Sequence, residues 1–250
     1  MKRINDPNFL LSRRFAAIAL PMGLMGFAVK LAAIFTYDGY LAREFPALIH
    51  KGNYFGFFTY TTNILVDFWL VLIALAIFLG RDKNPVTLFL AKASVQGFLT
   101  AMIFVVGVLY CSTMFWFDTP YSWSLWWGNF VTLWHHVVAP GFMIFLFFHP
   151  AGQTKLGGKD LALWTVYPVA YLLVTLVRGG VVNWYPYPFF DPAWETYASL
   201  NLSPRLGVAL AIVLLTIFII AIEMLAIRIH NRIIRRVTGN QNGRSSNEAV

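Results

Sequence analysis

Long apolar runs dominate this sequence and restrict its fold more than any other feature. Six of them can cross the hydrocarbon core of a bilayer, which takes about 20 residues of helix: 15–36, 54–79, 86–110, 124–148, 161–180 and 206–229. In lipid, only helices and closed barrels satisfy their own backbone groups. We therefore predict an all-α polytopic membrane protein, a bundle of six transmembrane helices over residues 1–236, followed by a disordered cytoplasmic tail at 237–250.

Composition supports this class and excludes several others. Only 12% of the 250 residues are charged, about half the usual fraction of a soluble domain. The single cysteine, Cys111, excludes an intrachain disulfide and a cysteine-based metal site. The net charge of +8 comes from residues that flank the apolar runs, which points to membrane topology and not to a nucleic-acid partner.

Basic residues predict which side of the membrane each connection occupies. Lysines and arginines flank the two ends of the chain and the second and fourth connections, whereas the acidic loop residues fall in the odd-numbered connections. The positive-inside rule then places both termini and the even connections in the cytoplasm. The residues behind this assignment are Lys2, Arg3, Arg13, Arg14, Arg81, Lys83, Lys155, Lys159, Arg228, Arg232, Arg235, Arg236 and Arg244 on the inside, and Asp38, Glu44, Asp118, Asp191 and Glu195 on the outside.

Polar residues within the apolar runs are the best candidates for function, since each is costly to bury in lipid. In the second run, Thr59, Asn63 and Asp67 are spaced four residues apart and so share one helical face. We expect Lys30 of the first run to pair with an acidic residue, Asp67 above all. Arg178 lies close enough to an interface to snorkel.

The fourth run carries a second polar group. Asn129, Thr132 and His136 share one face, and His135 lies beside Thr132. Both histidines precede Pro140, which frees backbone groups and favours a kink. Glu223, near the end of the sixth run, is expected to snorkel like Arg178.

A hydroxyl nucleophile needs a base within hydrogen-bond reach, and Thr59 with a histidine of the fourth run supplies such a pair. We expect Thr59, Asn63 and both histidines to face one shared cavity that opens toward the outer leaflet. The sequence has no Gly-x-Ser-x-Gly, His-Glu-x-x-His or phosphate-binding motif. His50, His149 and His230 lie in or near connections, so no pair of histidines is placed for haem. We therefore predict no metal and no other cofactor.

Several segments resemble the androgen-induced-gene (FAR-17a-like) six-transmembrane family, in particular its bacterial branch. The resemblance lies in Phe-Gly-Phe-Phe-Thr-Tyr-Thr-Thr-Asn at 55–63, His-His-Val-Val-Ala-Pro at 135–140, Trp-x-x-x-Pro-x-x-Tyr at 164–171, Arg-Gly at 178–179 and Trp-Tyr-Pro-Tyr-Pro-Phe-Phe-Asp-Pro at 184–192. Eukaryotic members of this family are intramembrane hydrolases of fatty-acid esters of hydroxy fatty acids, with a threonine nucleophile and a histidine base. The resemblance implies that Thr59 is the nucleophile. For the base it leaves two candidates, since the spacing His-x-x-Val-x-Pro favours His135 and a count of four residues back from the proline favours His136; of the two we favour His135.

The leading hypothesis is thus an intramembrane lipid-ester hydrolase of the bacterial inner membrane, with membrane lipids or acyl esters as its partners. Asn63 or Asn129 would stabilise the oxyanion, and Thr132 and Asp67 would line the substrate site. The alternative is a non-enzymatic carrier, or a lipid-binding protein, in which Lys30, Asp67, Gln96 and the histidines form a polar relay or hold helices together.

Overall fold

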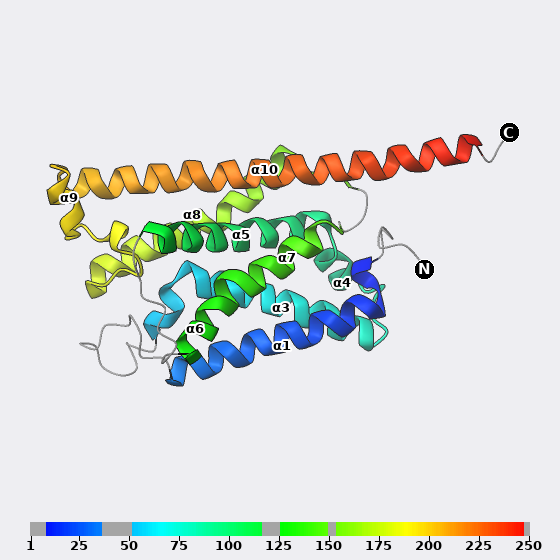
Figure 1. Ribbon diagram of the computed structural model, residues 1–250, viewed down its shortest axis with the longest axis horizontal. Helices are drawn as coiled ribbons and strands as arrows, with labels where there is room; N and C mark the ends of the chain where they lie inside the picture. Colours follow the sequence, from blue (N-terminus) through cyan, green and yellow to red (C-terminus); the bar gives the residue numbers. More distant parts are fainter. Residues whose placement is uncertain (1–8, 37–51, 117–125, 150–153, 248–250) are drawn as a thin grey trace.

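The computed structural model describes residues 9–36, 52–116, 126–149 and 154–247 (Figure 1). The side chains at 36, 113–116, 126–129 and 237–247 lie outside the described part. Within these ranges the chain is helical and contains no strand. Six helical spans are long and apolar enough to cross a membrane, which confirms the predicted fold class.

Five of the spans are single helices and one is composite. The single helices are α1 (Arg13–Thr36), α3 (Phe58–Phe78), α5 (Ala93–Trp116), α8 (Gly158–Val182) and α10 (Pro204–Asn247). The composite fourth span joins α6 (Trp126–Leu133), η4 (Trp134–Val138) and α7 (Ala139–Phe147). Short helices complete the fold: η1 (Phe9–Leu11), η2 (Tyr54–Gly56), α4 (Pro85–Leu90), η5 (Pro188–Phe190) and α9 (Glu195–Ser199).

Two boundaries differ from the expected ones. The run expected at 86–110 is divided, because α4 ends at Leu90 and α5 starts at Ala93. The cap of α4 explains its separate start: the Asn84 side chain accepts a hydrogen bond from the Val86 N–H at 2.9 Å, and Pro85 occupies the first helical turn. At the other end of the chain, α10 continues to Asn247 and so covers most of the expected disordered tail. No proline interrupts the helix there.

Close packing of α1 against α3 forms one edge of the bundle (Figure 1). Gly23 and Gly26 make this approach possible, since a Cβ at Gly23 would lie 2.9 Å from the Asp67 carbonyl oxygen and one at Gly26 would overlap the Asp67 carboxylate. Small residues play this role in membrane helices generally. The main hydrophobic core lies between α1, α3, α5 and α7 and includes Phe15, Ile73 and Met102.

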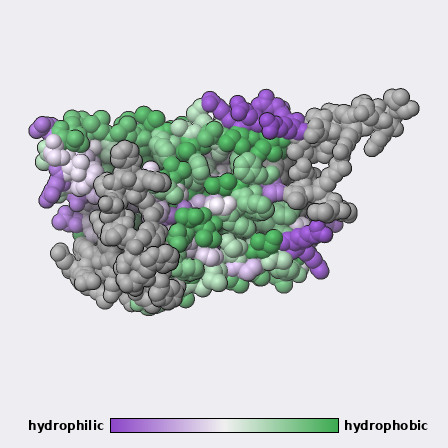
Figure 2. Space-filling model, viewed as in Figure 1, coloured by the Kyte–Doolittle hydropathy of each residue, from purple (hydrophilic) through white to green (hydrophobic). Residues whose placement is uncertain are grey.

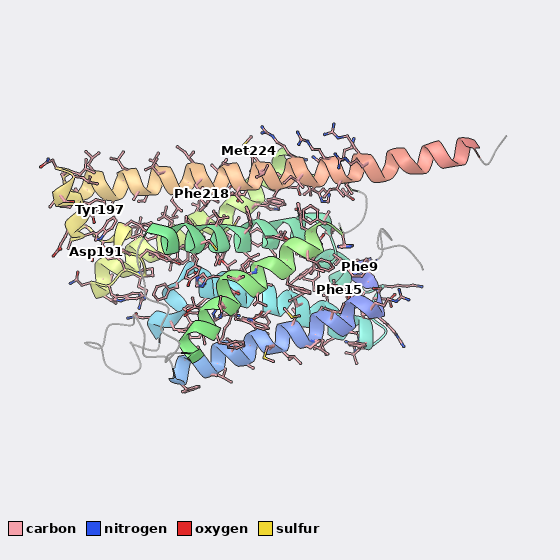
Figure 3. The ribbon with its side chains drawn as sticks, in the orientation of Figure 1. Phe9, Phe15, Asp191, Tyr197, Phe218 and Met224 are labelled. Carbon is pink, nitrogen blue, oxygen red and sulfur yellow. The ribbon has the colours of Figure 1, made fainter. Side chains whose placement is uncertain are left out.

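The outer surface is that of a multi-pass integral membrane protein. Figure 2 shows a broad hydrophobic band around the middle of the bundle, with hydrophilic residues gathered toward its two ends. Large apolar side chains of α8 and α10 point outward, among them Val177 and Leu214, which are 69% and 66% exposed. Figure 3 places Asp191 and Tyr197 at one end of the bundle and Phe9 and Phe15 toward the other.

The fourth span contains one π-helical turn, η4, which carries both histidines. In this turn the Ala139 N–H donates to the Trp134 carbonyl, five residues earlier. Pro140 has no N–H to donate to the carbonyl of His136, and this favours a local break in the regular α-helical pattern. Gly107 of α5 packs against the turn, because a Cβ there would lie 3.2 Å from the His136 carbonyl oxygen and 3.2 Å from Pro140 Cβ. Gly107 therefore allows α5 to pack directly against the π-helical turn.

Candidate functional site

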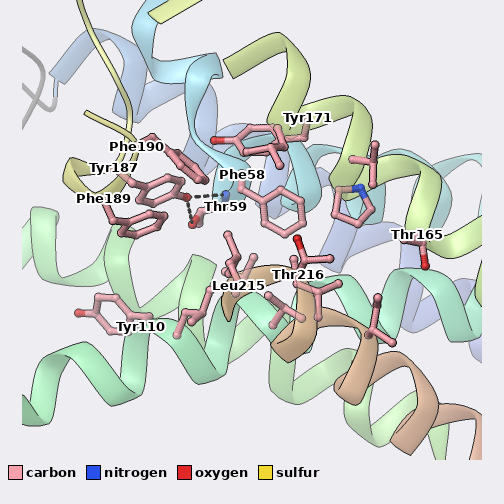
Figure 4. Close-up of a pocket in the computed structure, with 18 of the residues that line it drawn as sticks. Phe58, Thr59, Tyr110, Thr165, Tyr171, Tyr187, Phe189, Phe190, Leu215 and Thr216 are labelled. Atoms are coloured by element: carbon pink, nitrogen blue, oxygen red, sulfur yellow. Dashed lines mark hydrogen bonds between the residues drawn. The ribbon is translucent and has the colours of Figure 1, made fainter. Parts of the chain in front are cut away.

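An apolar cavity of about 220 Å³ lies between the start of α3 and helices α5, η4, α8 and α10, and the segment 187–190 covers one end of it (Figure 4). Most of its wall is aromatic or aliphatic. The polar side chains in the wall are few, and Thr59 and His136 are both among them. Its main lining residues are Phe58, Thr59, Leu109, Tyr110, His136, Thr165, Tyr171, Tyr187, Phe189, Phe190, Leu215 and Thr216.

Thr59 is the second residue of α3, and Tyr187 lies directly against it. The Thr59 N–H points to the Tyr187 hydroxyl oxygen at 3.4 Å, and the two hydroxyl oxygens are 3.5 Å apart (Figure 4). The first turn of a helix has N–H groups without partners inside the helix, so the Tyr187 hydroxyl takes a position where an anion would also be stabilised. Desolvation raises the pKa of Tyr187 above its ordinary value, so its hydroxyl keeps its proton and can donate it in a hydrogen bond.

His136 presents one ring nitrogen as a base. Its Nδ1 lies 2.9 Å from the carbonyl oxygen of Thr132, and a carbonyl can only accept, so Nδ1 carries the proton. The neutral ring therefore has its lone pair on Nε2. The ring stacks on Tyr110 with centroids 3.9 Å apart and an interplanar angle of 18°. These two contacts fix both the tautomer and the orientation of a residue that borders the cavity.

His135 lies outside the lining of the cavity. It is 1% exposed, its Nδ1 lies 2.7 Å from the Val131 carbonyl oxygen, and its ring meets Tyr60 edge-on at 5.0 Å. Asn63 joins this neighbourhood, since its amide donates to the carbonyls of Thr59 at 2.9 Å and His135 at 3.2 Å. The expected shared cavity therefore holds for Thr59 and His136, whereas Asn63 and His135 tie α3 to η4 behind it.

The predicted partner of Lys30 is confirmed. Its ammonium lies 2.5 Å from Asp67 Oδ2, and the two side chains are 4% and 3% exposed. Lys30 also donates to the Gly26 carbonyl at 3.3 Å. Asp67 is not among the residues that line the cavity. Its ion pair with Lys30 joins α3 to α1.

The remaining predicted residues take different positions. Thr132 contributes the backbone carbonyl that holds His136 and is not among the lining residues. The Asn129 side chain lies outside the described residues. Gln96 donates to the Leu146 carbonyl at 2.9 Å and so joins α5 to the end of α7.

The expectation that Glu223 snorkels is wrong. Its side chain is 0% exposed and accepts a hydrogen bond of 2.9 Å from Thr165, which lines the cavity from α8. The sequence position near the end of the sixth run suggested an interface, but α10 extends far past that point. Glu223 therefore lies within the packed part of the bundle, between α10 and α8.

Tyr187 is the residue that sequence reasoning missed. It belongs to a group of outer-loop aromatics whose abundance is explained by their preference for the membrane interface. The one available signal was the Tyr-Pro-Tyr-Pro-Phe run at 185–189, in which prolines fix the backbone.

Within the ranges that the structure describes, no three His, Cys, Asp or Glu side chains come together as a metal site.

No family model, curated protein or solved structure matches this chain.

Proposed function

We propose that this protein hydrolyses lipid esters within the membrane, with Thr59 as the nucleophile and His136 as the general base. One observation carries the proposal: the hydroxyl of Thr59 and the imidazole of His136 border the same apolar cavity. The resemblance to intramembrane threonine hydrolases supports the same pair of residue types. The preference between the two histidines is reversed, because His136 lines the cavity and His135 does not.

The proposed reaction starts with proton transfer from the Thr59 hydroxyl to Nε2 of His136 while the threonine oxygen attacks the ester carbonyl. The resulting oxyanion is stabilised by the Tyr187 hydroxyl and the Thr59 N–H, which are adjacent in the resting site. Collapse of the intermediate breaks the ester C–O bond, and the leaving alkoxide takes the proton from His136. Water then hydrolyses the acyl-threonine, with His136 again as the base, and releases the carboxylic acid.

Thr59 and His136 share no hydrogen bond among the contacts that the structure describes. In enzymes without substrate, the contact between nucleophile and base is often long and shortens in the substrate complex. Small movements of Tyr187, which now lies against the threonine hydroxyl at 3.5 Å, would free that hydroxyl for His136. The proposal therefore requires Tyr187 to exchange its contact with Thr59 for one with the substrate oxygen.

The walls of the cavity support an acyl substrate. They are built from Leu, Val and Ile side chains of α5, α8 and α10, with phenylalanines of α3 and η5, and Val169 of this wall is 43% exposed on the outer surface of the bundle. A lipid can therefore reach the cavity from the bilayer. The resemblance narrows the class to fatty-acid esters of hydroxy fatty acids, in the inner membrane of a bacterium.

The test is hydrolysis of a medium-chain fatty-acid ester by purified protein in detergent. We expect Thr59→Ala to abolish hydrolysis, and Thr216→Ala to retain it. Thr216 is a matched control because it lines the same cavity from α10 while its hydroxyl donates to the Ile212 carbonyl. His136→Gln should lower the rate by about 10²–10⁴-fold, the usual contribution of a general base, and His135→Gln by much less. Full activity of Thr59→Ala would reject the proposal and favour a carrier or lipid-binding protein.

A further inference from the structure

A second cavity, of about 430 Å³, shares Tyr171 with the candidate catalytic cavity. Tyr171 contributes to both walls, and its hydroxyl donates a hydrogen bond to the Gly56 carbonyl at 2.7 Å. The second cavity is a groove between η2, the start of α3 and the outer half of α8. Phe55 and Val174 border it and are 49% and 65% exposed, so the groove is open to the lipid.

Arg178 stands at one end of this groove and forms no ion pair with any residue that the structure describes. It contacts two neutral groups: it donates to Asn53 Oδ1 and lies over the Trp184 ring at 5.1 Å from the centroid. No carboxylate of the described residues lies within salt-bridge distance of it. A guanidinium has five N–H donors in a planar fork, so Asn53 and Trp184 orient the group and leave most donors available.

Asn53 holds the guanidinium from behind and is not among the residues that line the groove. Its side chain is 0% exposed, and its Nδ2 has no hydrogen-bond partner in the part of the chain that the structure describes. A buried N–H without a partner is costly, and a charge close to the hydrocarbon core without a counter-ion is costly too. An anion bound at Arg178 in the groove would relieve the second of these costs.

The groove below Arg178 follows a single stripe of α8. Tyr167, Ala170, Val174 and Arg178 recur at helical spacing along it. From Tyr167 to Arg178 the helix rises about 16 Å at 1.5 Å per residue, which is about half the thickness of the hydrocarbon core. The groove therefore has the length of one acyl chain in one leaflet, with the cation at the end where a headgroup would lie.

From these observations we propose that the groove binds a fatty acid, with its carboxylate on Arg178 and its chain along α8. One guanidinium matches one carboxylate in a two-point hydrogen bond, and a groove that is bordered by one stripe of α8 accommodates one chain. The site is separate from the catalytic pair and needs no hydrolysis. It holds a monoanionic single-chain lipid next to the cavity in which ester hydrolysis is proposed.

The test is equilibrium binding of radiolabelled palmitate to the Thr59→Ala protein in phosphatidylcholine nanodiscs, so that hydrolysis plays no part in the result. We expect saturable binding that Arg178→Gln weakens about tenfold or more, as for the loss of a hydrogen bond between charged groups. Arg205→Gln is the matched control, since Arg205 is an exposed basic residue at the same end of the bundle. It should bind like the parent.

A second variant guards against a misfolded Arg178→Gln protein. Val174→Trp fills the groove and leaves Arg178 in place, so it should also reduce palmitate binding while the protein elutes as the parent does in size exclusion. Methyl palmitate, which lacks the charge, should not compete. The proposal is overturned if Arg178→Gln binds palmitate as Arg205→Gln does, or if phosphatidylglycerol competes better than unlabelled palmitate.

Discussion

Thr59 is a weak nucleophile by itself, and its surroundings decide whether it can react. A threonine hydroxyl needs a base to remove its proton and donors to stabilise the charge that forms on the substrate. In the proposed mechanism His136 is the base, and the Thr132 carbonyl fixes its tautomer. Tyr187 and the first turn of α3 offer the donors. The site is therefore built from three separate segments of the chain: the first turn of α3, the fourth span and the loop that carries Tyr187.

Tyr187→Phe removes only the hydroxyl group and so tests whether this hydroxyl stabilises the oxyanion. The aromatic ring should keep its place, since it packs against Phe57 at 5.6 Å and Phe189 at 5.3 Å. We expect hydrolysis to fall by about 10²–10³-fold, the usual effect of removing one oxyanion donor. Tyr185→Phe, which also removes a tyrosine hydroxyl of this loop, should leave the rate unchanged. An unchanged rate in Tyr187→Phe would remove Tyr187 from the mechanism.

For single residues, the sequence could predict the importance of polar side chains that lie within apolar runs. Thr59, Lys30 and Asp67 are polar in apolar runs, and the cost of burying them predicts that they have partners or a function. The Lys30–Asp67 pair follows from this reasoning. The positions of Tyr187 and Glu223 could not be predicted by this reasoning. A tyrosine at the membrane interface and a carboxylate near the end of an apolar run are both common in membrane proteins.

At the scale of one element, η4 decides which histidine faces the cavity. Each residue of an α-helix advances by about 100° around the helix axis. A π-helical turn contains an extra residue, so the side chains after it occupy different angular positions, relative to those before it, than in an uninterrupted α-helix. Pro140 in the sequence indicated a disturbance in this span, but not its size or position. The sequence could therefore identify the pair His135–His136, but not which of the two lines the cavity.

Gly107 provides the test of this element. Gly107→Val should push α5 away from the His136 carbonyl and Pro140, which lie 3.2 Å from an added Cβ. Such overpacking costs about 1–3 kcal/mol, so we expect a lower unfolding midpoint and slower hydrolysis. Gly141→Ala is the control, because nothing lies within 4 Å of a Cβ there. If Gly107→Val leaves both quantities at the parent value, the contact does not hold η4 in place.

At the scale of the whole molecule, basic residues gather at one end of the bundle. Arg13 and Arg14 begin α1, Lys155 precedes α8, and four arginines of α10 follow its apolar part, namely Arg228, Arg232, Arg235 and Arg236 (Figure 1). The predicted topology places this end in the cytoplasm. Thr59 and the segment 187–190 lie toward the opposite end, so the proposed reaction would take place in the outer half of the membrane.

Cysteine labelling tests this orientation. In a Cys111→Ser background, Asp191→Cys should react with a membrane-impermeant maleimide on intact cells, because Asp191 belongs to the connection predicted outside. Lys155→Cys should react only after the membrane is permeabilised. Labelling in the opposite pattern would invert the topology and place the candidate site in the inner leaflet.

Identification of the covalently modified residue tests whether Thr59 is the nucleophile. Purified protein is treated with a lipophilic fluorophosphonate, digested and mapped by mass spectrometry, with Thr59→Ala and Thr216→Ala treated in parallel. We predict one adduct, on Thr59, which is lost in Thr59→Ala and retained in Thr216→Ala. An adduct on another residue, or equal labelling of Thr59→Ala and the parent protein, would contradict the proposal that Thr59 is the nucleophile.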